Sequence, residues 1–144
     1  MIKNSGSRRR ALIIGISDYD KLDPLSFCRN DGQEVSKVLS SLDYDIKDGN
    51  VLLGHIEWQK MRETIYDFFN NDNTMPDDLL LFYYSGHGIY NKGLYLAASE
   101  TDRYLPSRRG FNFEELRRLM NDSISIYPYY VFETTFAKLY YLVP

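Results

Sequence analysis

The chain lacks several features that mark common classes of protein. Its 144 residues include one cysteine, Cys28, which excludes a disulfide framework within the chain and is too little for a structural zinc site. No apolar run approaches the roughly 18 residues that a membrane span requires, and the N-terminus has no apolar stretch of signal-peptide length. These absences predict a cytoplasmic protein that does not associate with membranes.

The sequence also lacks a large excess of positive or negative charge. Against 20 Asp and Glu stand 17 Lys and Arg, and this net charge of -3 gives no reason to expect a nucleic-acid partner. The sequence ALIIGI, residues 11–16, is not followed by a glycine-rich phosphate loop, which weakens the hypothesis of an anion-binding doubly wound domain. His55, His87 and Cys28 have no ligand spacing that supports a metal site, so we expect neither metal nor cofactor.

Short apolar runs alternate with amphipathic segments along the chain. The runs at residues 11–16, 50–54 and 79–84 predict strands, and residues 93–99 predict a short edge strand or hairpin. Strands that alternate with helices indicate one α/β domain with a mainly parallel sheet. Residues 1–7 are polar and predict a flexible leader.

Sequence signals for helix starts set the predicted helices. In DGQE, Asp31 and Glu34 form a capping box, and Val35, Val38, Leu39 and Leu42 follow at helical spacing. Residues 57–70 predict a second amphipathic helix with Trp58, Met61, Ile65, Phe68 and Phe69 on one stripe. Asn112 and Glu115 predict a third capped helix, whose buried face is formed by Phe113, Leu116 and Leu119.

The third apolar run ends in an unusual way. In LLLFYYSGHG, residues 79–88, His87 stands between two glycines just beyond the predicted strand. Chemistry in open α/β sheets gathers at the carboxyl ends of strands, and an imidazole titrates near neutral pH. We therefore interpret His87 as a general base, and the amide of Gly88 as a donor to a developing oxyanion. A structural histidine in a tight turn is the alternative.

Two segments together carry a family resemblance. RRRALIIGISDYDKLDPLSFCRND, residues 8–31, followed by a helix and then by DLLLFYYSGHG, residues 78–88, resembles the N-terminal part of a caspase-like peptidase domain. The resemblance is closer to the metacaspase and prokaryotic caspase-like branch than to animal caspases. It covers residues 8–122 and leaves 123–144 as a divergent tail. It implies a three-layer α/β/α sandwich with a mainly parallel sheet, truncated at the C-terminal side.

The resemblance also implies an activity and site residues. The family consists of cysteine endopeptidases that act on peptides or proteins through a Cys/His dyad, in which His87 is the base and Gly88 the oxyanion donor. Asp31, in the Cys28–Asp31 segment, matches an acidic residue that selects a basic substrate side chain. Its helix-cap role is an equal alternative. Ser85 matches a pocket-lining serine, and Cys28 belongs to the same substrate-binding segment.

The nucleophile of that dyad is missing from the sequence. The family pattern requires a strand after the third helix that ends in an Asp-x-Cys-x-Ser-Gly segment, but residues 123–144 contain no cysteine. A histidine base without a thiol has no group to activate, and Cys28 is a poor substitute because single cysteines are more often small buried residues. We therefore expect an inactive endopeptidase domain. A non-catalytic scaffold that binds a protein or peptide is the alternative.

The tail has three possible origins. A frameshift near Ser123 is the explanation that the sequence favours, and the alternatives are a true degenerate relative and a fragment whose missing half comes from elsewhere. Pro128 interrupts what should be a ladder strand, so residues 125–132 should cover the neighbouring strand only imperfectly. If no segment covered the strand predicted at residues 79–84, its long apolar edge would be exposed.

Overall fold

A mainly parallel sheet forms the centre of the molecule. The computed structural model describes residues 8–125, 127–134 and 138–142, so the leader predicted at residues 1–7 lies outside the described residues. The strand order is β2-β1-β4-β8-β9, and β3 also pairs with β1. All pairs are parallel except β8 with β9. The strands are β1 (Arg9–Ile16), β2 (Tyr44–Asp45), β3 (Val51–Gly54), β4 (Leu79–Gly86), β8 (Tyr127–Thr134) and β9 (Lys138–Leu142).

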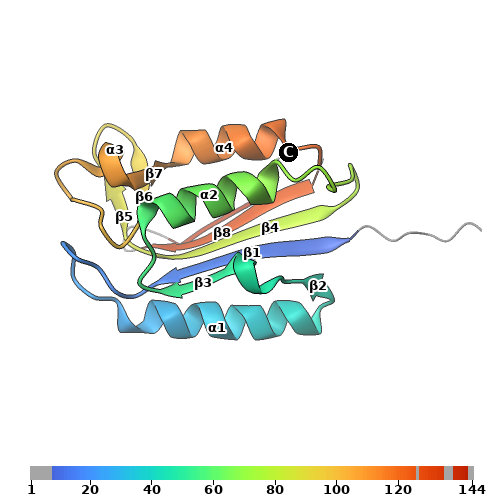
Figure 1. The fold of residues 1–144 in the computed structure, drawn as a ribbon, viewed down its shortest axis with the longest axis horizontal. Coiled ribbons are helices and arrows are strands. Elements are labelled where there is room, and N and C mark those ends of the chain that lie inside the picture. The colour runs from blue at the N-terminus through green and yellow to red at the C-terminus, as the bar shows by residue number, and fades with distance from the viewer. Residues whose placement is uncertain (1–7, 126, 135–137, 143–144) are drawn as a thin grey trace, which may run out of the picture.

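Helices cover both faces of this sheet (Figure 1), which confirms the predicted α/β fold. Helix α1 (Ser26–Ser41) lies on one face, and α2 (Trp58–Phe69) and α4 (Phe113–Asp122) lie on the other. A short 3-10 turn, η1 (Asp48–Asn50), precedes β3. A small antiparallel sheet continues from the end of β4, and it consists of β5 (Gly88–Tyr90), β6 (Leu94–Ala97) and β7 (Gly110–Asn112), with the short helix α3 (Pro106–Arg109) before β7.

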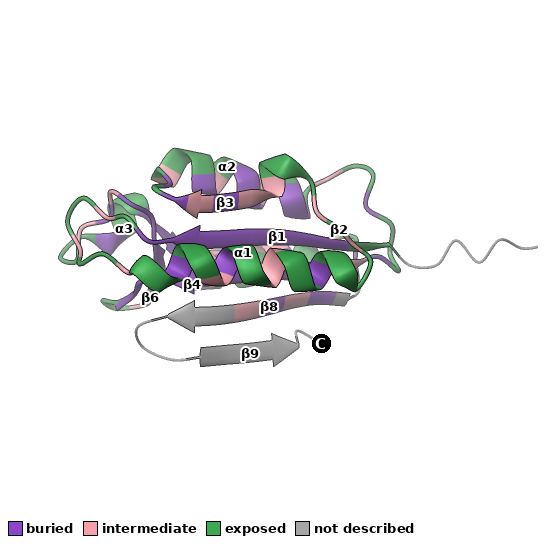
Figure 2. Ribbon diagram, turned by 90° about the horizontal axis from the view of Figure 1, so that it is seen from below, coloured by how far each residue is buried: buried purple, intermediate pink, exposed green. Residues whose placement is uncertain are grey.

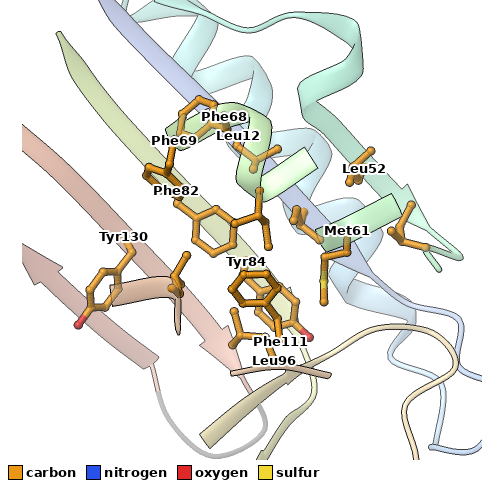
Figure 3. Close-up of a cluster of buried hydrophobic side chains, with 14 of the residues drawn as sticks. Leu12, Leu52, Met61, Phe68, Phe69, Phe82, Tyr84, Leu96, Phe111 and Tyr130 are labelled. Carbon is orange, nitrogen blue, oxygen red and sulfur yellow. The ribbon is translucent and has the colours of Figure 1, made fainter. Parts of the chain in front are cut away.

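The larger core lies between the sheet and the α2/α4 layer. Leu80, Phe82 and Tyr84 alternate along β4 and face this core, because successive side chains of a strand point to opposite faces. Figure 3 shows Phe82 and Tyr84 among Met61, Phe68 and other core residues. The predicted stripe of α2 is confirmed, since Met61, Ile65, Phe68 and Phe69 are buried and Trp58 packs against them.

The predicted start of the first helix is wrong. Helix α1 begins at Ser26, two residues after Pro24, and no side chain caps it, so Asp31 lies inside the helix rather than at its N-cap. Tertiary packing overrides the local capping signal, because the buried positions start at Cys28 and continue through Gly32 to Leu39. Val38 and Leu42 consequently lie off the buried face and are 56% and 50% exposed. Figure 2 looks onto α1, with the buried strand β1 behind it.

The prediction for the third helix is confirmed in its cap. Asn112 is the N-cap of α4, and its side chain accepts hydrogen bonds from the amides of Glu114 and Glu115. The carboxylate of Glu115, predicted to complete the capping box with Asn112, forms an ion pair with Arg62 of α2 at 2.8 Å. Leu116 and Met120 are buried, and Phe113 and Leu119 pack against the same core.

The expectation of imperfect cover on β4 is wrong. Strand β8 pairs with β4 in parallel from Leu79↔Tyr127 to Gly86↔Thr134, so it follows β4 to its end. Pro128 is tolerated because it is the second residue of β8 and precedes Tyr129, where the pairing with β9 begins. A strand therefore does follow the third helix, and it reads Tyr127–Thr134 without a cysteine.

Candidate active site

His87 lies between the end of β4 and the start of β5. Because β1, β3, β4 and β8 run parallel, their carboxyl ends meet at one edge of the sheet, and His87 is placed at this edge as the sequence predicted. Its side chain is largely buried, with the residue 9% exposed. The ring is therefore held by protein contacts and is not a mobile surface group.

The contacts of the His87 ring define its tautomer. Nε2 lies 2.8 Å from the backbone oxygen of Asp23, in the loop between β1 and α1. A carbonyl oxygen only accepts hydrogen bonds, so Nε2 carries a proton and donates it. In the neutral ring the lone pair is then on Nδ1. Nδ1 is accordingly the nitrogen that would act as a base.

Two tyrosines, the partly buried Tyr19 and the fully buried Tyr84, support His87 from behind. The Tyr19 hydroxyl accepts a hydrogen bond from the His87 amide at 2.9 Å, and the Tyr19 ring meets the imidazole edge-on with centroids 4.6 Å apart. The Tyr84 hydroxyl lies 2.7 Å from the Ala97 oxygen and 2.9 Å from the His87 oxygen, and it is also bonded to Tyr19. Burial raises the pKa of both phenols, so both stay protonated as neutral hydrogen-bonding groups.

This arrangement predicts a specific effect of Tyr19→Phe. We expect the free energy of unfolding to fall by about 1–2 kcal/mol, since the buried His87 amide loses its acceptor. The imidazole nitrogen signals of His87 should also shift in NMR spectra of the full chain. Tyr66→Phe is the matched control, because the Tyr66 hydroxyl bonds Glu115 between α2 and α4. Unchanged His87 signals in Tyr19→Phe would contradict the proposed support.

A cavity of about 470 Å³ opens beside His87. Its walls come from Leu22 in the β1–α1 loop, from Gly88–Tyr90 of β5 with the following Asn91, and from Arg103 and Tyr104. Gly88 pairs with Leu96 in the small sheet. The cavity brings the imidazole into contact with a space that a ligand can occupy, so the geometry combines a potential base with a binding site.

The family model of the caspase domain matches residues 8–127. This chain belongs to the caspase domain family. No curated protein matches the chain significantly. The family match extends past residue 122, where the resemblance in the sequence ends, and it includes the first residue of β8.

Ser85 and Asp31, two further residues predicted from the caspase resemblance, lie on the side of the sheet that α1 covers. Ser85 pairs with Gly15, and both are on the face covered by α1. Its buried hydroxyl has no hydrogen-bond partner among the described residues. Asp31 is partly buried in the second turn of α1. Neither of these two residues is among the described residues that line the cavity beside His87, and their substrate-binding roles stay predictions.

Cys28 is close to the site but separated from it. The residue is 1% exposed in the first turn of α1, and its carbonyl faces Gly15 of β1. Burial is the largest cause of the raised pKa of Tyr19 and of Tyr84, and the electrostatic influence of Cys28 adds to the rise in both. Cys28 therefore lies near Tyr19 and Tyr84, the two tyrosines whose hydroxyls contact the His87 backbone. The described residues that line the cavity beside His87 do not include Cys28.

Sequence reasoning missed the residues that orient His87 and shape the cavity. Tyr19 and Asp23 lie in a loop without periodicity, and Arg103 and Tyr104 lie in another. The available signal was that residues 17–25 follow a parallel strand at the same edge as His87. His55 follows β3 and pairs with Asp20 at 3.0 Å on the surface.

Other kinds of site find no support in the described part of the chain. Residues 8–125, 127–134 and 138–142 hold no group of three His, Cys, Asp or Glu side chains that could bind a metal ion. Within the same ranges, no helix has both the length and the apolar character needed to span a membrane.

Proposed function

We propose that this chain is a caspase-family domain that binds peptide in the cavity beside His87 and does not hydrolyse it without another source of a nucleophile. The observation that supports this proposal best is the position of Cys28, the one cysteine in the sequence. Cys28 is buried in the first turn of α1 against β1, whereas His87 faces the cavity with no cysteine on β8, the strand next to β4. Members of a peptidase family act on proteins, so a peptide is the expected ligand.

The chemistry of such a dyad explains why the thiol matters. His87 would remove a proton through Nδ1 from a cysteine thiol, and the resulting thiolate would attack the peptide carbonyl. The Gly88 amide would stabilise the oxyanion, a role that we infer from the family. With no thiol beside Nδ1, the first of these steps has no reactant. The domain then retains the base and the binding site but not covalent catalysis.

A hydrolysis assay tests this proposal. We expect the purified full chain to cleave unstructured protein and fluorogenic peptides no faster than its Cys28→Ser and His87→Ala variants, because loss of a covalent nucleophile lowers turnover about a millionfold. The same peptides should bind the wild-type chain, as measured by NMR titration. Turnover that the wild-type chain shows and Cys28→Ser abolishes would instead make Cys28 the nucleophile.

The origin of the tail can be tested separately. All eight residues of β8 pair with β4 in one register, which favours a true relative without the nucleophile over an out-of-frame tail. Translation of the nucleotide sequence past codon 123 in the two other frames decides between them. An Asp-x-Cys segment in either frame would establish the frameshift.

The resemblance to metacaspases further implies that the peptide carries a basic side chain next to Asp31. This preference remains a proposal.

A further inference from the structure

The cavity beside His87 has walls of a distinct chemical character. Leu22 and Ile89 are apolar, and Tyr90 and Tyr104 at its rim are 71% and 81% exposed. Two phenol rings with this much accessible surface can bury large apolar area against a ligand, and aromatic pairs gain further from stacking. A volume of about 470 Å³ is in the range of sites that hold small organic groups.

The charge in this cavity is positive. Arg103 is the permanently charged residue among the described lining residues, and these include no carboxylate. A guanidinium stacks on aromatic faces and repels Lys or Arg side chains. The cavity next to it, of about 550 Å³, does contain Glu100 and Asp102. Those carboxylates already pair with Arg109 at 2.8 Å and with Lys21 at 3.8 Å.

We infer that the cavity beside His87 is a subsite for an aromatic side chain of the bound peptide. The ring would lie between Tyr90 and Tyr104, with Leu22 and Ile89 at its sides and the Arg103 guanidinium available to its face. This inference rests on the proposed peptide-binding function and adds the class of side chain that is selected. It is distinct from the basic-residue pocket expected from Asp31, which lies outside this cavity.

Binding of matched peptides tests the inference without any need for turnover. Hexapeptides acetylated and amidated at their ends, alike except for Phe, Ala, Lys or Glu at one position, are titrated into isotope-labelled full chain, and the His87 and Tyr104 signals are followed. We expect the Phe peptide to bind at least about tenfold more tightly than the Ala peptide, since burial of a Phe side chain stabilises by roughly 1.5–3 kcal/mol. The Lys peptide should bind most weakly.

Variants of the exposed rim provide the matched comparison. Tyr104→Ala should weaken the Phe peptide about tenfold and leave the Ala peptide unchanged, while Tyr104→Phe should keep the preference. Leu105→Ala is the control, because Leu105 is the neighbouring exposed residue and lines the other cavity. Arg103→Gln should bring the Lys peptide closer to the Ala peptide.

The outcomes separate the two proposals. Equal affinity for all four peptides, or tightest binding of the Glu or Lys peptide, would overturn the aromatic subsite and leave peptide binding at His87 intact. Failure of every peptide to bind would overturn both the subsite and the proposed function. A preference for Phe that survives Tyr104→Ala would also overturn the subsite, because the aromatic group would then be held elsewhere.

Discussion

Gly15→Ala is expected to lower the free energy of unfolding by about 3 kcal/mol, the upper part of the usual range for overpacking in a core. A Cβ atom at position 15 would lie 2.4 Å from the Cys28 carbonyl oxygen and 3.2 Å from Leu53 Cδ2. The closer contact is with backbone, so the new methyl group can be accommodated only if α1 moves away from β1. The adjacent Gly32 is tight for the same reason, as its Cβ would lie 2.5 Å from Leu53 Cδ2.

Urea denaturation of the full chain measures this effect, and a melting-temperature decrease of about 10 °C should accompany it. Gly49→Ala is the matched control, since a Cβ at position 49 would have nothing within 4 Å. Its unfolding free energy should stay within about 0.5 kcal/mol of the wild-type value. Equal losses in the two variants would show that α1 does not cross β1 as closely as these contacts require.

The same close crossing explains why the start of α1 could not be predicted from the sequence. Asp31 and Glu34 form a local pattern that is typical of a helix N-terminus, and Gly32 inside a helix is locally unfavourable. Both signals indicate a boundary near residue 31. The helix nevertheless starts at Ser26, because Cys28 and Gly32 pack against β1, a contact between segments that no local pattern reveals.

Elements with a strong hydrophobic pattern were predictable. The runs that became β1, β3 and β4 are short, apolar and bounded by polar residues, and the α2 stripe repeats at helical spacing over its whole length. Strand β2 is two residues long and β9 is five, so neither leaves a clear periodic signal. Pro128 hides the extent of β8, because a proline argues against a central strand even within a tyrosine-rich run.

The site could be predicted in its centre but not in its surroundings. His87 was identified because two glycines and a strand end give it a distinctive position in the sequence. Its partners Asp23 and Tyr19 lie 64 and 68 residues away along the chain. They arrive through the parallel pairing of β1 and β4, so only the folded structure identifies the acceptor of the Nε2 proton and the cavity beside the ring.

Gly86→Ala should have an effect nearly as large as Gly15→Ala, about 2–3 kcal/mol of unfolding free energy, together with displacement of His87. A Cβ at position 86 would lie 2.5 Å from the Tyr19 hydroxyl oxygen and 2.6 Å from that of Tyr84. Neither oxygen can retreat without loss of a bond, because Tyr19 accepts from the His87 amide and Tyr84 contacts the Ala97 oxygen. The glycine before His87 is thus required by the tyrosine pair.

A double-mutant cycle with Tyr19→Phe isolates this cause. Tyr19→Phe removes the nearest oxygen, so Gly86→Ala should cost about 1 kcal/mol less in that background than in the wild-type chain, an interaction energy typical of groups in direct contact. Urea denaturation gives the four stabilities, and the His87 imidazole signals report whether Nε2 still donates to Asp23. Strictly additive losses would show that position 86 does not contact Tyr19. An undisturbed His87 spectrum in Gly86→Ala would show that the tyrosine pair does not control the imidazole.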